Sequence, residues 1–162
     1  MLGIEPNECP EIDLYQNIGR FVYKYAGALL EDATSLLLSE GDNDGPLIIE
    51  NTVSSNPVRF HIDCFTEADN IAHEIKWRDA TTDGDHIKKE HNKIKSIVDA
   101  GHVPVRVMFY LPVRAQARKI QARIIAEFER EGAAYVGEDA WTYVENRSGV
   151  NLRRLLRELT PP

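Results

Sequence analysis

The sequence predicts an α/β fold in which a mixed central β-sheet is flanked by helices. Three observations support this class: a long amphipathic segment at residues 12–38, three closely spaced strand-like segments between residues 47 and 77, and a helical segment followed by a fourth strand-like run between residues 86 and 111. Three successive strands and a helical crossover place helices on both faces of such a sheet. The 162 residues suit one domain, with a core at about 12–111 and a helical C-terminal part at 112–162.

The first helix is predicted by apolar residues that recur at spacings of three and four. They are Leu14, Ile18, Val22, Tyr25, Leu29, Ala33 and Leu36. This pattern fits one long amphipathic helix or two short ones. The turn-forming residues 41–46, Gly-Asp-Asn-Asp-Gly-Pro, then end it.

Three strands and a second helix follow. Segments 47–53, 58–65 and 71–77 have strand patterns, and residues 67–70 form a four-residue hairpin loop between the last two. A polar loop at 78–85 leads to a helix at about 86–100. The predicted inner stripe of that helix is Ile87, His91, Ile94 and Val98, and its predicted outer face carries Lys88, Lys89, Lys93 and Lys95.

The remaining elements are a buried strand and a helical C-terminal part. Residues 103–111 are short, apolar and rich in β-branched side chains, which suits a strand covered on both faces. Residues 114–130 are helical by pattern. After turns at Gly132 and Gly137, helices are expected at 138–146 and 150–159.

Charge is distributed unevenly along the chain. The net charge is −7, which alone argues against a polyanionic partner, yet residues 86–130 hold ten basic and four acidic side chains. That segment forms either a polyanion-binding surface or ordinary solvated helix faces. Cys9 and Cys64 lie far apart, no signal peptide is evident and no apolar stretch is long enough to span a membrane, so we expect a cytoplasmic protein.

One constellation of side chains indicates chemistry. The hairpin register places Asp63 opposite Glu74 and His61 opposite Lys76, so that Asp63, Glu74 and Lys76 emerge together on one face. The other face is expected to be core, formed by Phe60, Ile62, Cys64, Ile71, Ile75 and Trp77.

Two facing carboxylates repel unless a cation lies between them. Mg²⁺ suits such a pair, and the backbone carbonyl of Ile75 adds a third oxygen. Lys76 beside the metal would orient or deprotonate a water and offset charge on a phosphate. The alternative is a cross-strand ion pair on a solvated sheet face.

This arrangement resembles the PD-(D/E)XK phosphodiesterase superfamily over about residues 12–111. Residues 73–87, HEIKWRDATTDGDHI, look like the ApaLI-type type II restriction endonucleases in particular. Ile62, rather than proline, precedes Asp63. The resemblance implies a Mg²⁺-dependent endonuclease, for which Mn²⁺ substitutes, that hydrolyses phosphodiester bonds of double-stranded DNA as a homodimer. It also implies that Asp63, Glu74 and Lys76 are catalytic, and the short chain leaves sequence specificity open.

Further candidates surround this centre. Glu31 on the first helix is either an additional metal ligand, as in some superfamily members, or a solvated side chain, and Asp83-Gly84-Asp85 is either a helix cap or a metal-contacting or base-contacting turn. DNA contacts are expected from Arg78, Thr81, Thr82, Lys88 and Lys89, or from Arg114 and Arg118 on the later helix. The alternative functions are a DNA repair or processing nuclease without sequence specificity and a catalytically silent interaction module.

Overall fold

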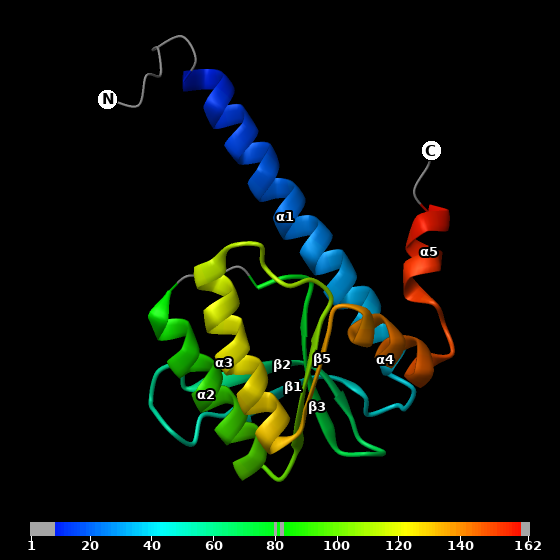
Figure 1. Ribbon diagram of the computed structural model, residues 1–162. Helices are drawn as coiled ribbons and strands as arrows, with labels where there is room; N and C mark the ends of the chain where they lie inside the picture. Colours follow the sequence, from blue (N-terminus) through cyan, green and yellow to red (C-terminus); the bar gives the residue numbers. More distant parts are fainter. Residues whose placement is uncertain (1–8, 80, 82, 160–162) are drawn as a thin grey trace.

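The computed structural model describes residues 9–79, 81 and 83–159. In chain order the elements are α1 (Cys9–Leu38), β1 (Gly45–Glu50), β2 (Arg59–Thr66), β3 (Ile71–Lys76), α2 (Gly84–Asp99), β4 (Val103–Met108), α3 (Ala115–Glu131), β5 (Ala133–Val136), α4 (Glu138–Ser148) and α5 (Leu152–Leu159) (Figure 1). Residues 12–38 therefore belong to one long helix. None of the helices in the described ranges has the length and apolar composition that crossing a membrane requires.

The sheet is mixed, as predicted, and its strand order is β1-β2-β3-β4-β5. Strand β2 runs antiparallel to both of its neighbours, β1 and β3, whereas β4 runs parallel to β3, and β5 runs parallel to β4. The C-terminal part is not wholly helical, because β5 forms the sheet edge within it. The approach of β5 to β4 requires Gly132, where a Cβ atom would lie 2.0 Å from the carbonyl oxygen of Pro104.

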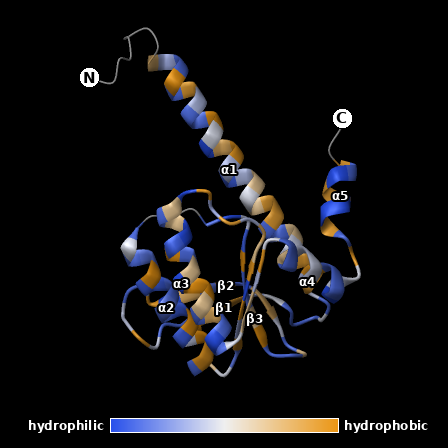
Figure 2. Ribbon diagram, viewed as in Figure 1, coloured by the Kyte–Doolittle hydropathy of each residue, from blue (hydrophilic) through white to orange (hydrophobic). Residues whose placement is uncertain are grey.

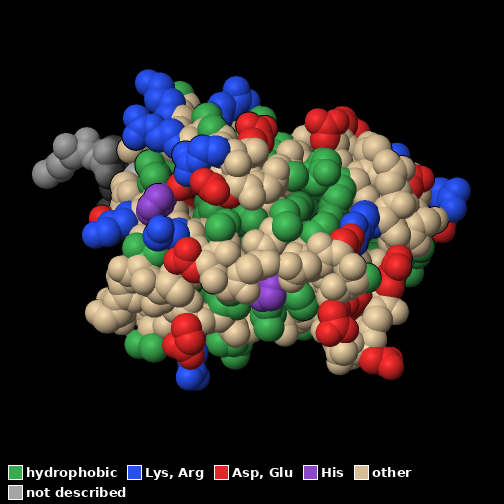
Figure 3. All heavy atoms as spheres, turned by 90° about the horizontal axis from the view of Figure 1, so that it is seen from below, with side chains coloured by type: hydrophobic (Ala, Val, Ile, Leu, Met, Phe, Trp, Pro, Cys, Tyr) green, Lys and Arg blue, Asp and Glu red, His purple; other side chains and the backbone are tan. Residues whose placement is uncertain are grey.

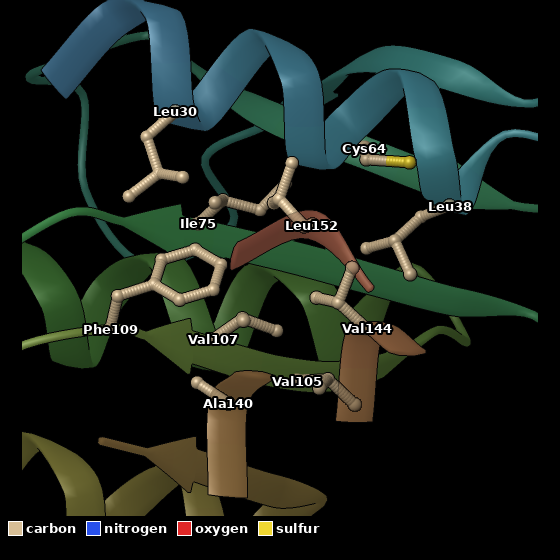
Figure 4. Packing of buried hydrophobic residues seen from close by; sticks show 10 residues of the cluster. All are labelled: Leu30, Leu38, Cys64, Ile75, Val105, Val107, Phe109, Ala140, Val144 and Leu152. Carbon is tan, nitrogen blue, oxygen red and sulfur yellow. The ribbon is translucent and has the colours of Figure 1, made fainter. Parts of the chain in front are cut away.

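The two faces of the sheet are covered by different helices. On one face α1 and α4 enclose an apolar cluster that includes Leu30, Cys64, Ile75, Val107 and Phe109 (Figure 4). On the other face lie α2 and α3 (Figure 1). We call these the apolar face and the polar face, because the second also buries a set of charged and amide side chains.

The polar face is organised around Arg106 of β4, whose side chain is fully buried. Its guanidinium donates to Glu90 Oε2 at 3.0 Å, to Asp79 Oδ2 at 3.1 Å and to Gln121 Oε1 at 3.0 Å. Glu90 belongs to α2 and Gln121 to α3. One strand residue therefore fixes both helices and the loop that follows β3.

A β-bulge in β2 changes which side chains share a face. Gly45 of β1 pairs with Phe65 and Leu47 pairs with Ile62, so two residues of β2, Asp63 and Cys64, lie opposite Pro46 alone. The prediction that Phe60 and Ile62 share a face with Cys64 and Ile75 is therefore wrong. Phe60 and Ile62 pack with Ala72 and Ile97 on the polar face, whereas Cys64 and Ile75 belong to the apolar cluster.

Helix α2 is rotated relative to its predicted orientation. Its N-cap is Asp83, whose side chain accepts from the amide of Asp85, so this turn is a helix cap, the first of the two readings. The side chain of His91 is 49% exposed, although it was expected to face inward. The residues that α2 buries are Glu90, Asn92, Ile94, Ser96 and Ile97.

The first half of α1 extends away from the sheet (Figure 1). Its buried residues, Gly27, Leu30, Thr34 and Leu38, all lie in the second half. The extended half nevertheless carries apolar side chains along its length (Figure 2). Between residues 14 and 29, seven large apolar side chains are 49–65% exposed: Leu14, Tyr15, Ile18, Phe21, Val22, Tyr25 and Leu29.

Candidate active site

The candidate site lies where β2 and β3 separate. Their backbone pairing has the predicted register and ends at Cys64 and His73. The next free amide of β3, that of Ile75, donates instead to the side-chain Oδ2 of Asp63 at 2.7 Å. The carboxylate of Asp63, which lies within the bulge of β2, thus replaces a missing strand partner.

Three oxygens converge on the ammonium of Lys76. Its Nζ lies 2.8 Å from Glu74 Oε1, 3.2 Å from Asp63 Oδ2 and 3.0 Å from the carbonyl oxygen of Ile75. The structure therefore brings together the predicted trio and the predicted backbone carbonyl. These oxygens surround one cationic atom.

Burial and charge act differently on the two carboxylates. Burial and the charge of Glu74 raise the pKa of Asp63 above its ordinary value. Burial would also raise the pKa of Glu74, but the charges of Lys76 and Lys93 lower it to about 2. The pKa of Lys76 is raised by Glu74 and Asp63 in spite of burial. Glu74 is therefore the firmly ionised member of the pair.

Lys93 of α2 is a site residue that the sequence pattern assigned to the outer helix face. Its Nζ donates to Glu74 Oε2 at 2.6 Å and to the carbonyl oxygen of His61 at 3.0 Å, and its side chain is only 14% exposed. Each carboxylate oxygen of Glu74 therefore has its own lysine. Lys93 lies one turn after Glu90, which α2 also buries, but this burial is seen only in the structure, so no local sequence signal locates Lys93.

Glu31 reaches the same region from the apolar-face helix α1. Its Oε1 accepts from the amide of Trp77 at 3.4 Å, and burial raises its pKa, with Lys76 and Asp63 among the charges that act on it. Glu31 and Asp63 also line an open cavity of about 540 Å³ with Ser35, Pro46 and His61. The site is thus accessible from the α1 side.

The predicted DNA-contacting residues occupy several surfaces. The guanidinium of Arg78 lies over the rings of Tyr23 and Trp77, with its carbon 5.4 Å and 5.6 Å from their centroids, so it is turned toward α1. Thr81 is partly buried in the loop, and Thr82 lies outside the described residues. Exposed positions on α2 and α3 are held by Lys88, Lys89, Arg114 and Arg118.

Basic side chains gather on the side of the molecule where α2 and α3 lie (Figure 3). This accords with the basic composition of residues 86–130. The loop after β3 is held beside this side by Asp79, which contacts Arg106 at 3.1 Å and His86 at 2.7 Å. The network of the polar face therefore fixes the chain that leaves the candidate site.

The donor set fits a hard divalent cation. Within the described ranges there is no group of three or more His, Cys, Asp or Glu side chains that could hold a metal ion. However, Asp63 and Glu74 supply two carboxylates and Ile75 a carbonyl, and Mg²⁺ commonly takes one or two carboxylates and completes its shell with water and phosphate. The ammonium of Lys76, held by all three oxygens, shows that their geometry accepts a cation.

Comparison with known families gives one match, to a family described as ApaLI-like restriction endonuclease, over residues 1–160. The comparisons with curated proteins and with solved structures find no match. The matched range covers nearly the whole chain, including every element that builds the site.

Proposed function

The chain belongs to the ApaLI-like restriction endonuclease family, and from that premise we propose that it is a Mg²⁺-dependent type II enzyme that hydrolyses phosphodiester bonds in double-stranded DNA. The observation that carries the proposal is the convergence of Asp63 Oδ2, Glu74 Oε1 and the Ile75 carbonyl oxygen around one cationic position. This convergence supports the PD-(D/E)XK assignment that the sequence predicts. Mn²⁺ is expected to substitute for Mg²⁺, because both accept oxygen ligands.

Asp63, Glu74 and the Ile75 carbonyl would hold the metal, and Glu31 is placed to add a further carboxylate. The bound metal would polarise the phosphodiester and lower the pKa of an attacking water. Lys76 offers a charged N–H group beside these ligands, where it can orient that water and neutralise charge that develops on the phosphate oxygens. To do so, its ammonium must leave the position among the three oxygens.

We further propose that DNA lies along the side of the molecule that carries α2 and α3. Lys88 and Lys89 are exposed on α2, one to two turns before Lys93, and Arg114 and Arg118 are exposed at the start of α3. Replacing both Lys88 and Lys89 with alanine should flatten the dependence of log affinity on log salt by up to about 1.8, because each phosphate contact contributes a slope of ~0.9. An unchanged slope would move the contact surface to α3.

The enzyme is proposed to act as a homodimer joined through the extended half of α1. Six apolar side chains from Leu14 to Tyr25 are 49–65% exposed within the described chain, and this part of the helix extends away from the sheet (Figure 1). If each of these six side chains removes about 100 Å² from water, two copies bury roughly 1,200 Å², which is at the lower end of the range of stable interfaces.

The charges on this half of α1 favour an antiparallel pair. Glu11 and Asp13 lie near its start, and Arg20 and Lys24 lie two to three turns later. Two antiparallel helices that cross near residue 17 bring the acidic pair of one copy to the basic pair of the other. A parallel pair would place like charges together.

A charge exchange tests the interface without DNA. One variant carries Glu11→Lys and Asp13→Lys, and the other carries Arg20→Glu and Lys24→Glu. By sedimentation, each variant alone should be monomeric, and an equal mixture should form dimers. Phe21→Asp should also dissociate the dimer, whereas Val113→Asp, at a site 82% exposed outside α1, should not. Dimers in every sample would contradict the α1 interface.

Cleavage of a supercoiled plasmid tests the chemistry. In Mg²⁺ we expect linear products whose sequenced ends share one motif, and no products in EDTA. Ends without a shared motif would support the processing nuclease instead. Absence of cleavage in both Mg²⁺ and Mn²⁺, from a protein shown to be folded, would support the silent interaction module.

A further inference from the structure

Lys93 is the second cation of the candidate site and has no role in the family pattern on which the proposed function rests. It comes from α2, not from the hairpin that carries Asp63, Glu74 and Lys76. Its ammonium contacts Glu74 Oε2 at 2.6 Å, on the side of the carboxylate away from Lys76. With Glu74 itself 2% exposed, solvent screens this pair little.

Lys93 also spans the gap between the diverging strands. Besides Glu74 of β3, it donates to the carbonyl oxygen of His61 in β2 at 3.0 Å. These two contacts fix the rotation of the Glu74 carboxylate about its own axis. Oxygen Oε1 is thereby left in contact with Lys76 Nζ, the atom that Asp63 Oδ2 and the Ile75 carbonyl oxygen also contact.

The position of Lys93 is itself held by buried contacts. Glu90, one turn earlier on α2, is bound to Arg106 of β4 at 3.0 Å. Lys93 lies four residues before Ile97 and therefore on the same face of α2. This face packs on the sheet near Ile62 and Ala72. A rotation of α2 that moved Lys93 into solvent would therefore expose Glu90 and Ile97 as well.

We propose that Lys93 is a positioning residue that orients Glu74 for metal binding and sets the affinity of the site for divalent cations. The inference rests on the proposed metal site. When Mg²⁺ takes the place of the Lys76 ammonium, Lys93 remains on Oε2 and keeps one positive charge close to the incoming ion. That charge opposes a divalent cation, so the site binds metal more weakly than its carboxylates alone would.

The test is calorimetric titration of the free protein with Mn²⁺ and with Mg²⁺. Lys93→Gln removes the charge but retains an N–H donor for Glu74, and we expect it to bind metal at least about tenfold more tightly than the wild type. Lys93→Arg retains the charge and should stay within about threefold of the wild type. Lys95→Gln removes the same charge from an exposed position two residues along α2 and should also stay within about threefold.

The direction of the change separates this role from a structural one. A residue that only supports the fold would weaken metal binding when replaced, in step with the free energy of unfolding. Unchanged or weaker affinity in a folded Lys93→Gln protein would overturn the inference. Should Lys93→Gln be unfolded, Lys93→Met, which fills the same space, replaces it. This variant removes the charge and the N–H donor together, so tighter metal binding would support the opposing charge, and weaker binding by a folded protein would overturn it. A wild-type protein that binds neither ion would instead refute the proposed metal-dependent function.

Discussion

The two faces of the sheet are built on different physical principles. The apolar face packs α1 and α4 through side chains such as Ile75, Val107 and Phe109, and burial of these groups needs no particular direction of contact (Figure 4). The polar face joins α2 and α3 to β4 through the guanidinium of Arg106 and its three acceptors. Apolar clusters that include Ile97 and Ile124 also lie on the polar face. Apolar packing therefore supplies stability on both faces, and the network of Arg106 adds a fixed position on one.

The polar face is costly to maintain. Arg106 Nε and Gln121 Nε2 are buried and find no hydrogen-bond partner within the part of the chain that the structure describes. Each such atom costs about 1–3 kcal/mol. An apolar replacement would hold the helices equally well, so we infer that the network is kept because it fixes α2, and with it Lys93, relative to Glu74.

The largest expected effect separates catalysis from stability. Asp63→Asn should lower plasmid cleavage in Mg²⁺ by about four orders of magnitude, because it removes one of the proposed metal ligands. Its free energy of unfolding should stay the same or rise slightly, since burial raises the pKa of Asp63 and asparagine can still accept from the amide of Ile75. Cleavage rates and urea denaturation measure the two quantities. Near wild-type cleavage would show that Asp63 is not a ligand.

The next effect compares coupling on the two faces. Phe109→Ala and Leu38→Ala, at opposite ends of the apolar cluster, should each cost about 2–5 kcal/mol and add within ~0.5 kcal/mol (Figure 4). Arg106→Met should cost about 3–5 kcal/mol, because it leaves buried carboxylates unpaired.

Adding Glu90→Met to Arg106→Met should then recover at least about 1 kcal/mol, since one uncompensated charge is removed. Urea denaturation of the single and double variants gives these coupling energies. Strict additivity on the polar face would remove the distinction between the faces.

A smaller effect concerns acid. His73 lies on the apolar face, and burial lowers its pKa to about 4. As pH falls, His73 is protonated in the unfolded chain before it is protonated in the folded protein. The free energy of unfolding therefore decreases between pH ~6.5 and pH ~4, by roughly 3 kcal/mol at most. Urea denaturation at about pH 7 and about pH 4.5 should show a smaller acid loss for His73→Gln than for the wild type. Equal losses would refute this assignment.

The smallest effect has the opposite sign. His86 lies on the polar face, where its hydrogen bond to Asp79 raises its pKa above the ordinary value of a histidine. The contribution of protonated His86 to the free energy of unfolding is complete below the pKa of the unfolded chain. It is lost as pH rises through the higher pKa of the folded protein. Denaturation between about pH 6 and pH 8.5 should show a decline that His86→Gln removes. A decline of the same size in both proteins would assign it to another group.

Much of the fold follows from apolar patterns in the sequence. The helix at 12–38, the hairpin and the strand at 103–111 have strong periodicity or β-branched composition, and hairpin register brings Asp63, Glu74 and Lys76 together. Strand β5 has four residues, begins with two alanines and depends on the close approach at Gly132, so no local pattern predicts it.

Lys93 was missed for a related reason. Hydrophobic periodicity assumes that a helix buries its apolar residues, whereas α2 buries Glu90, Asn92 and Ser96 and exposes His91. Residues that contact α2 from distant parts of the sequence, in β1–β2, β3 and β4, determine which side of this helix is buried. The bulge at Asp63 and Cys64, which puts Cys64 on the other face of the sheet from Ile62, similarly depends on pairing with β1. The register of the β2–β3 hairpin alone does not predict it.

The occupied position of Lys76 also bears on how the protein is made. Two carboxylates, Asp63 and Glu74, are matched by two ammonium groups, Lys76 and Lys93, before any ion arrives. A newly synthesised chain therefore closes this part of the sheet without waiting for a metal. If the proposed metal-dependent function is right, chelator should consequently stop cleavage while leaving the fold intact.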